Sequence, residues 1–162
     1  MVTQRRSHEP GHRRKFMVVI DDTPECLRAP VYAARRAEHT GGILLMLHVI
    51  APGEFQHWLG VEEIMRAEAQ EAAQEAFALA TEAVQAHADI KPDLVIREGT
   101  RSEEILKLID EDQDIAILVL AAAPGKEGPG PLVTSIASGG GFPIPVTIVP
   151  AALSDEDIDA LA

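Results

Sequence analysis

The sequence has one cysteine, few aromatic residues and no long hydrophobic segment, and these shortages exclude several classes of protein. Cys26 is the only cysteine, so the chain can form neither an internal disulfide nor a cysteine-based zinc site. Its longest apolar run, Ile43 to Ile50, is interrupted by His48 and is far shorter than the roughly 20 residues that span a bilayer. We therefore expect a cytoplasmic protein with no membrane partner.

Aromatic residues make up only 4% of the 162 residues, whereas hydrophobic residues make up 46% and charged residues 25%. The apolar fraction is mostly alanine, valine, isoleucine and leucine, a mixture that suits buried parallel strands and alanine-rich helices. A chain of this length can bury one core, and it is too short for two ordinary domains.

The net charge is −12, but residues 1–15 carry an excess of positive charge. Their only acidic residue is Glu9, and their basic residues are Arg5, Arg6, Arg13, Arg14 and Lys15. No apolar periodicity is present there, so we expect residues 1–14 to form a disordered basic leader. An arm that binds nucleic acid or another anionic surface is the less favoured interpretation.

Short apolar runs alternate with segments of helical periodicity along the rest of the chain. The runs predict five strands, at residues 16–20, 43–50, 94–96, 115–120 and 146–149. The periodic segments predict helices at about residues 24–40, 61–88, from residue 100 onward, and 132–138, with a short acidic helix in residues 151–162. Strands that alternate with helices form right-handed βαβ crossovers, so we expect a parallel sheet covered on both faces.

Three of the expected helices begin with a capping signal. Thr23 can cap the first helix, and two capping-box patterns follow, Thr100 with Glu103 and Ser154 with Asp157. In an open α/β sheet, ligands bind beyond the carboxyl ends of the strands. The loops that follow the first, second and fourth strands are therefore the places where we expect a binding site.

Four short blocks stand at characteristic places in this pattern. They are Val19–Thr23, Leu47–Ile50, Glu98–Gly99 and Phe142–Val146. In this order and spacing the blocks resemble the universal stress protein family, and the similarity runs from about Lys15 to Pro150. The resemblance implies a Rossmann-like, three-layer α/β/α domain over residues 15–150, similar to adenine-nucleotide hydrolases, whose five parallel strands lie in the order 3-2-1-4-5.

The resemblance also implies a ligand and an assembly. Family members that bind ATP or AMP, with magnesium, place the carboxylate at the end of strand one beside the ribose and phosphates, and a valine of strand two against adenine. Those positions are Asp21 and Val49 here. Such proteins form homodimers through the last strand, which is Val146 to Val149 in this sequence.

Elementary chemistry supports the same two residues independently. An aspartate at a strand end can accept hydrogen bonds from ribose hydroxyls, and an aliphatic surface beside a backbone edge suits a purine. Asp22 and Thr23, which follow Asp21, and Leu120, in the fourth strand, belong to the same candidate site. The alternative interpretation is that Asp21 or Asp22 only caps the following helix.

The phosphate side departs from the family pattern, in which Gly-x2-Gly is followed nine residues later by Gly-Ser or Gly-Thr. Alignment from the fourth strand places Ala121 at the first glycine, and alignment from the last block places Leu132 and Val133 at the Gly-Ser pair. A rearranged loop could still bind phosphate through Gly125, Lys126, Gly128 and Gly130, with Lys126 supplying charge. The alternative is a proline-stiffened turn with an exposed lysine.

Other chemistry-bearing residues have weaker settings. His48 is expected to be buried or hydrogen-bonded, Cys26 to pack inertly, and His57 and Trp58 to line a pocket mouth at most. Neither a catalytic base nor a metal-ligand cluster can be identified. The leading hypothesis is a regulatory or stress-response protein that binds ATP or AMP; a dimeric interaction module that has lost nucleotide binding is the alternative, followed by a slow ATPase.

Overall fold

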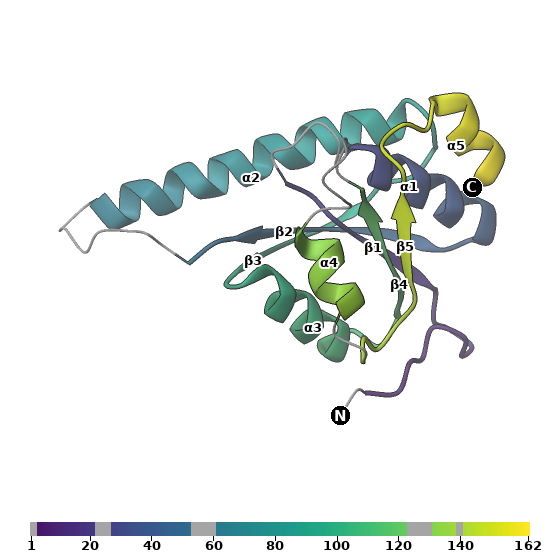
Figure 1. Ribbon diagram of the computed structural model, residues 1–162, viewed down its shortest axis with the longest axis horizontal. Helices are drawn as coiled ribbons and strands as arrows, with labels where there is room; N and C mark the ends of the chain where they lie inside the picture. Colours follow the sequence, from purple (N-terminus) through teal and green to yellow (C-terminus); the bar gives the residue numbers. More distant parts are fainter. Residues whose placement is uncertain (1–2, 22–26, 53–60, 123–130, 139–140) are drawn as a thin grey trace.

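The five strands form one parallel sheet with helices on both faces (Figure 1). The computed structural model describes residues 3–21, 27–52, 61–122, 131–138 and 141–162. The strands are β1 (Lys15–Val19), β2 (Ile43–Ile50), β3 (Asp93–Glu98), β4 (Ile115–Ala121) and β5 (Val146–Val149). The helices are α1 (Arg28–Thr40), α2 (Val61–Gln85), α3 (Arg101–Glu111), α4 (Pro131–Ser138) and α5 (Asp155–Leu161).

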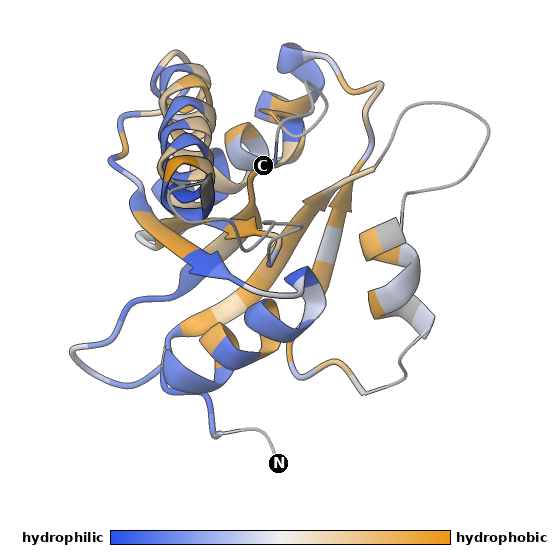
Figure 2. Cartoon of the chain, turned by 90° about the vertical axis from the view of Figure 1, so that its left-hand side faces the viewer, coloured by the Kyte–Doolittle hydropathy of each residue, from blue (hydrophilic) through white to orange (hydrophobic). Residues whose placement is uncertain are grey.

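The strand order is β3-β2-β1-β4-β5, and every neighbouring pair is parallel. This confirms the predicted three-layer α/β fold and its 3-2-1-4-5 order. Helices α1, α2 and α5 lie on one side of the sheet, and α3 and α4 lie on the other (Figure 1). The strands between these layers are mainly hydrophobic, as Figure 2 shows.

Alternate residues of each strand enter two separate hydrophobic clusters, which explains the unbroken apolar runs. In β1, Phe16 and Val18 pack in the cluster under α1 and α2, whereas Met17 and Val19 pack in the cluster under α3 and α4. All four side chains are buried. A polar residue at any of these positions would lose its hydration without gaining a partner.

The helix ends agree with the sequence in part. The Ser154 capping box is present, since the Ser154 hydroxyl accepts from the Asp157 N–H and the Asp157 carboxylate accepts from the Ser154 N–H. Thr100 is the N-cap of α3, but its side chain makes no cap hydrogen bond. The prediction of a capping box formed by Thr100 and Glu103 is therefore wrong. The Thr100 carbonyl instead accepts the Glu104 N–H at 2.9 Å. The predicted cap Thr23 lies outside the described residues.

Helix α2 is the longest element, and its first turns extend beyond the end of the sheet (Figure 1). Its surface is rich in glutamate, and its buried side is mostly alanine with Phe77 and Val84. No helix within the described ranges is both long and apolar enough to cross a membrane.

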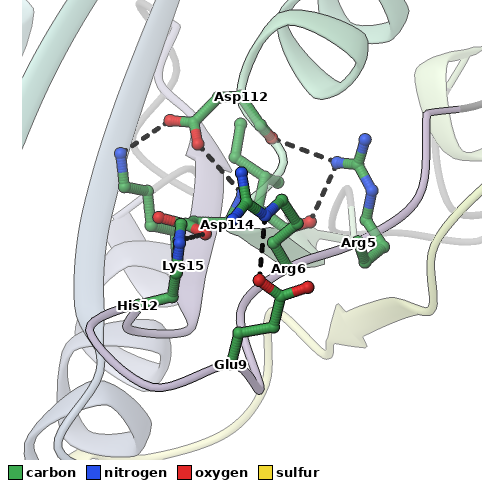
Figure 3. A network of polar contacts seen from close by, with 8 residues as sticks. Arg5, Arg6, Glu9, His12, Lys15, Asp112 and Asp114 are labelled. Atoms are coloured by element: carbon green, nitrogen blue, oxygen red, sulfur yellow. Dashed lines mark hydrogen bonds and ion pairs between the residues drawn. The ribbon is translucent and has the colours of Figure 1, made fainter.

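The leader, which we expected from the sequence to be disordered, makes specific contacts with the rest of the chain. Residues 3–14 lie against the turn between α3 and β4 (Figure 3) and, through Arg13, against the end of α1. The Arg5 guanidinium donates to the carbonyls of Asp112 and Ile115, at 3.1 and 3.3 Å, and His12 lies 2.7 Å from the Asp114 carboxylate. No local pattern in the sequence reveals these contacts, because the acceptors lie about a hundred positions away.

Candidate functional site

The carboxyl ends of the strands meet at one edge of the sheet, and β2 holds its two neighbours there. Beyond the end of β1, the Ile20 N–H donates to the Leu47 carbonyl at 2.7 Å. Beyond the end of β3, the Gly99 N–H donates to the Ile50 carbonyl at 2.9 Å. Backbone hydrogen bonds therefore fix where each chain segment leaves the sheet.

The structure brings Asp21 and Val49 together at this edge. Val19 pairs with Leu47, and because parallel strands keep their register, Asp21 comes level with Val49 two residues further on. Asp21 is half-buried, while Val49 is buried and belongs to the cluster under α3 and α4. By this register a carboxylate and an aliphatic residue lie at the ends of neighbouring strands. Asp22 and Thr23 lie outside the described residues.

On the other side of β1, the end of β4 contributes an apolar surface. Leu120 is buried and Ala121 is half-buried, and Ala121 pairs with Val149 of β5. The Ala122 N–H donates to the Val149 carbonyl at 2.9 Å. Leu120 and Ala121 are therefore at the same edge of the sheet as Asp21.

Helix α4 presents apolar residues where the family pattern has glycine and a hydroxyl. Val133 is buried in the cluster under α3 and α4, and Leu132 packs against the same cluster. Both side chains contribute to the core, and neither offers a hydrogen-bond donor to an anion. Gly125, Lys126 and Gly128 lie outside the described residues, as do Cys26, His57 and Trp58.

The sequence reasoning did not single out Glu104, which is buried next to Gly99 at the end of β3. Gly99 has a φ of +152°, and a Cβ there would lie 2.7 Å from the Glu104 Oε1 and 2.9 Å from its Cγ. The Lys107 ammonium donates to the Glu104 Oε1 at 2.9 Å, and this hydrogen bond raises the pKa of Lys107. The sequence feature that could have indicated this contact is Gly99, which stands just before α3, together with Glu104, the fourth residue of that helix.

His48 confirms the prediction of a buried, hydrogen-bonded histidine. Only 9% of the residue is exposed, and Nδ1 lies 2.9 Å from the Ile20 carbonyl. Its ring meets the Phe77 ring edge-on, with centroids 6.1 Å apart. His48 thus contacts the residue that directly precedes Asp21.

Within the described part of the chain, no three His, Cys, Asp or Glu side chains are grouped so that they could hold a metal ion. Two surface hollows in that part lie away from the strand ends. One is between the leader and the α3–β4 turn, and the other is between α1 and the end of α2. The described part of the strand-end edge carries the carboxylate of Asp21 after β1 and those of Glu98 and Glu104 at the end of β3.

We compared the chain with protein-family models, curated proteins and solved structures. The model of the Universal stress protein family matches residues 12–150. A search of curated proteins gave no match.

Several solved structures share the fold. The universal stress protein UspA from Lactobacillus plantarum is 17% identical over 84% of this chain and 97% of its own, with a TM-score of 0.68. A universal stress protein in complex with cAMP is 17% identical over 86% and 98% of the two chains, with a TM-score of 0.64. One from Archaeoglobus fulgidus in complex with dAMP is 18% identical over 83% and 96%, with a TM-score of 0.58. At such identities the likeness shows the fold alone.

Proposed function

The chain belongs to the universal stress protein family, and from that premise we propose that it is a regulatory or stress-response protein that binds an adenine nucleotide, ATP or AMP, at the carboxyl edge of its sheet. The observation that carries the proposal is the position of Asp21 beside Val49, at the ends of neighbouring strands. The cAMP and dAMP complexes of two structural neighbours support the ligand class.

Each half of the nucleoside has a matching group in this arrangement. The Asp21 carboxylate would accept hydrogen bonds from the ribose hydroxyls. The Val49 side chain and the backbone at the end of β2 would contact the adenine ring, whose faces are apolar and whose edge carries donors and acceptors. The proposed activity is binding, and no bond is made or broken.

The phosphate groups have less support. The side chains of Leu132 and Val133 supply no donor, so phosphate contacts would come from backbone N–H groups and from the segment that contains Gly125, Lys126 and Gly128, with magnesium accompanying ATP. The buried position of Val133 favours a second candidate function, a dimeric interaction module of the same family that has lost nucleotide binding. In that case the carboxyl edge of the sheet would have the same structure but would bind no nucleotide.

Thermal unfolding with and without nucleotide separates these two functions. ATP with magnesium, ATP alone and AMP, each at about 1 mM, are added to the wild type, Asp21→Ala and Asp93→Ala. Because a ligand that binds only the native state stabilises it, the unfolding midpoint of the wild type should rise with ATP or AMP. Asp21→Ala should lose this rise, and Asp93→Ala, an exposed carboxylate at the opposite edge, should keep it. No rise with any nucleotide would contradict the proposal and favour the interaction module.

We also propose a homodimer that pairs β5 strands. β5 is the last strand of the sheet, and its Ile148 side chain is 42% exposed. An unpaired apolar edge strand invites pairing with another chain. Ile148→Lys should convert a dimer to a monomer in light scattering, whereas Leu94→Lys, on the opposite edge strand β3, should not. A wild type that is monomeric at high concentration would refute this assembly.

A further inference from the structure

Two hydrogen bonds from β2 hold the residue that precedes Asp21. The Leu47 carbonyl accepts the Ile20 N–H at 2.7 Å. The His48 Nδ1 lies 2.9 Å from the Ile20 carbonyl. A carbonyl can only accept a hydrogen bond, so Nδ1 carries the proton and donates it. Both polar groups of the Ile20 backbone are thus bound to consecutive residues of one strand.

The hydrogen bond between His48 and the Ile20 carbonyl is buried. Ile20 is 1% exposed and His48 9% exposed, and the imidazole edge is packed against the Phe77 ring. Water does not replace a lost donor easily in such a place, and a buried carbonyl without a partner is costly. The Ile20 carbonyl therefore depends on the imidazole.

His48 and Val49 are consecutive residues of β2, so their side chains face opposite layers of the fold. His48 points to the layer of α1 and α2, where Phe77 lies, and Val49 belongs to the cluster under α3 and α4. His48 thus holds the backbone just beyond β1, next to Asp21, while Val49 forms the apolar surface at the end of β2.

We propose that His48 is a positioning residue of the nucleotide site. By binding the Ile20 carbonyl it fixes the direction in which the chain leaves β1, and so the place of the Asp21 carboxylate relative to Val49. The inference rests on the proposed nucleotide binding and assigns a role to a residue that does not touch the ligand.

Three variants separate positioning from simple packing. His48→Leu removes the donor and keeps an apolar side chain. His48→Asn retains an N–H at about the same distance from Cα as Nδ1. Met46→Leu is the control, because Met46 is buried on β2 in the cluster that contains Phe77, and its thioether cannot donate a hydrogen bond to the backbone after β1.

The first measurement is the exchange rate of the Ile20 amide hydrogen, by NMR on the full chain without ligand and corrected for global stability. We expect His48→Leu to raise this rate about tenfold, since local opening is governed by local contacts. The second is the dissociation constant of AMP by calorimetry, which we expect to rise roughly fivefold, the effect of one hydrogen bond. His48→Asn should restore both values to within about twofold, and Met46→Leu should leave both unchanged.

The outcomes are distinguishable. An Ile20 amide that is equally protected in the wild type and His48→Leu overturns the proposal, whether or not a nucleotide binds. So does an equal loss of AMP affinity in all three variants, which would indicate packing alone. A wild type that binds neither AMP nor ATP contradicts the proposed function, and the exchange comparison then decides by itself whether His48 holds the strand end.

Discussion

The two edges of the same sheet are closed by different kinds of contact. At the amino edge the contacts come from charged side chains: Lys15 of β1 pairs with Asp112 at 2.6 Å, and Arg5 of the leader donates to backbone carbonyls (Figure 3). At the carboxyl edge, backbone hydrogen bonds tie the described strand ends together, and apolar side chains such as Val49 and Leu120 lie beside Asp21. The charged groups at the amino edge are thus paired within the chain, whereas the carboxyl edge is the place where we propose that a nucleotide binds.

The largest effect that would test this comparison is expected at the carboxyl edge, from Gly99→Ala. The φ of +152° strains any side-chain-bearing residue, and the added Cβ would lie 2.7 Å from the buried Glu104 carboxylate. We expect the free energy of unfolding in urea to fall by about 3 kcal/mol. The substitution should weaken the end of β3, where the Gly99 N–H donates to the Ile50 carbonyl.

Gly41→Ala is the control for this substitution. Gly41 ends α1 with a φ of +70°, and a Cβ there would meet nothing within 4 Å. Strain alone should cost about 1 kcal/mol. If the two variants lose the same stability, the contact with Glu104 is not what makes Gly99 necessary.

A smaller effect is expected at the amino edge, from Arg5→Ala. This substitution removes the donors to the Asp112 and Ile115 carbonyls, which are partly buried. Because solvent screens part of the interaction, we expect a loss of about 1 kcal/mol in the free energy of unfolding. Arg6→Ala, which removes an exposed pair with Glu9, should change stability by less than about 0.5 kcal/mol. Equal losses would show that the leader contributes only general charge.

The smallest effect concerns the pH dependence of the leader. Thr3 donates to the Asp110 carboxylate from its hydroxyl and from its N–H, and the hydroxyl hydrogen bond lowers the pKa of Asp110 below its ordinary value of 3.8. A carboxyl group whose pKa is lower in the folded state stabilises the fold above the unfolded pKa, and this stabilisation is lost as the pH falls through the folded pKa. The wild type should therefore exceed Asp110→Asn in stability at pH 5.5, and this advantage should be smaller at pH 3, which lies below the ordinary pKa of 3.8. A difference that stays constant between these pH values would contradict the assignment.

Much of the fold could be predicted because it depends on local pattern. β2 and β5 have the predicted bounds, and the Ser154 capping box is where the sequence placed it. These features follow from apolar runs, helical periodicity and residues at fixed spacing, all of which act between near neighbours in the chain. The five-strand order came from the family resemblance, since strand count alone does not determine it.

The sequence by itself determined the fold class, the burial of His48 and the position of Asp21 and Val49 at strand ends. Only the tertiary structure decided what the leader does, because Arg5 and His12 find their acceptors in the α3–β4 turn. It also decided that Glu104 packs against Gly99, and that His48 holds Ile20, which lies 28 positions earlier. These contacts join segments that are distant in the sequence, and their geometry exists only once the sheet has brought the strand ends together.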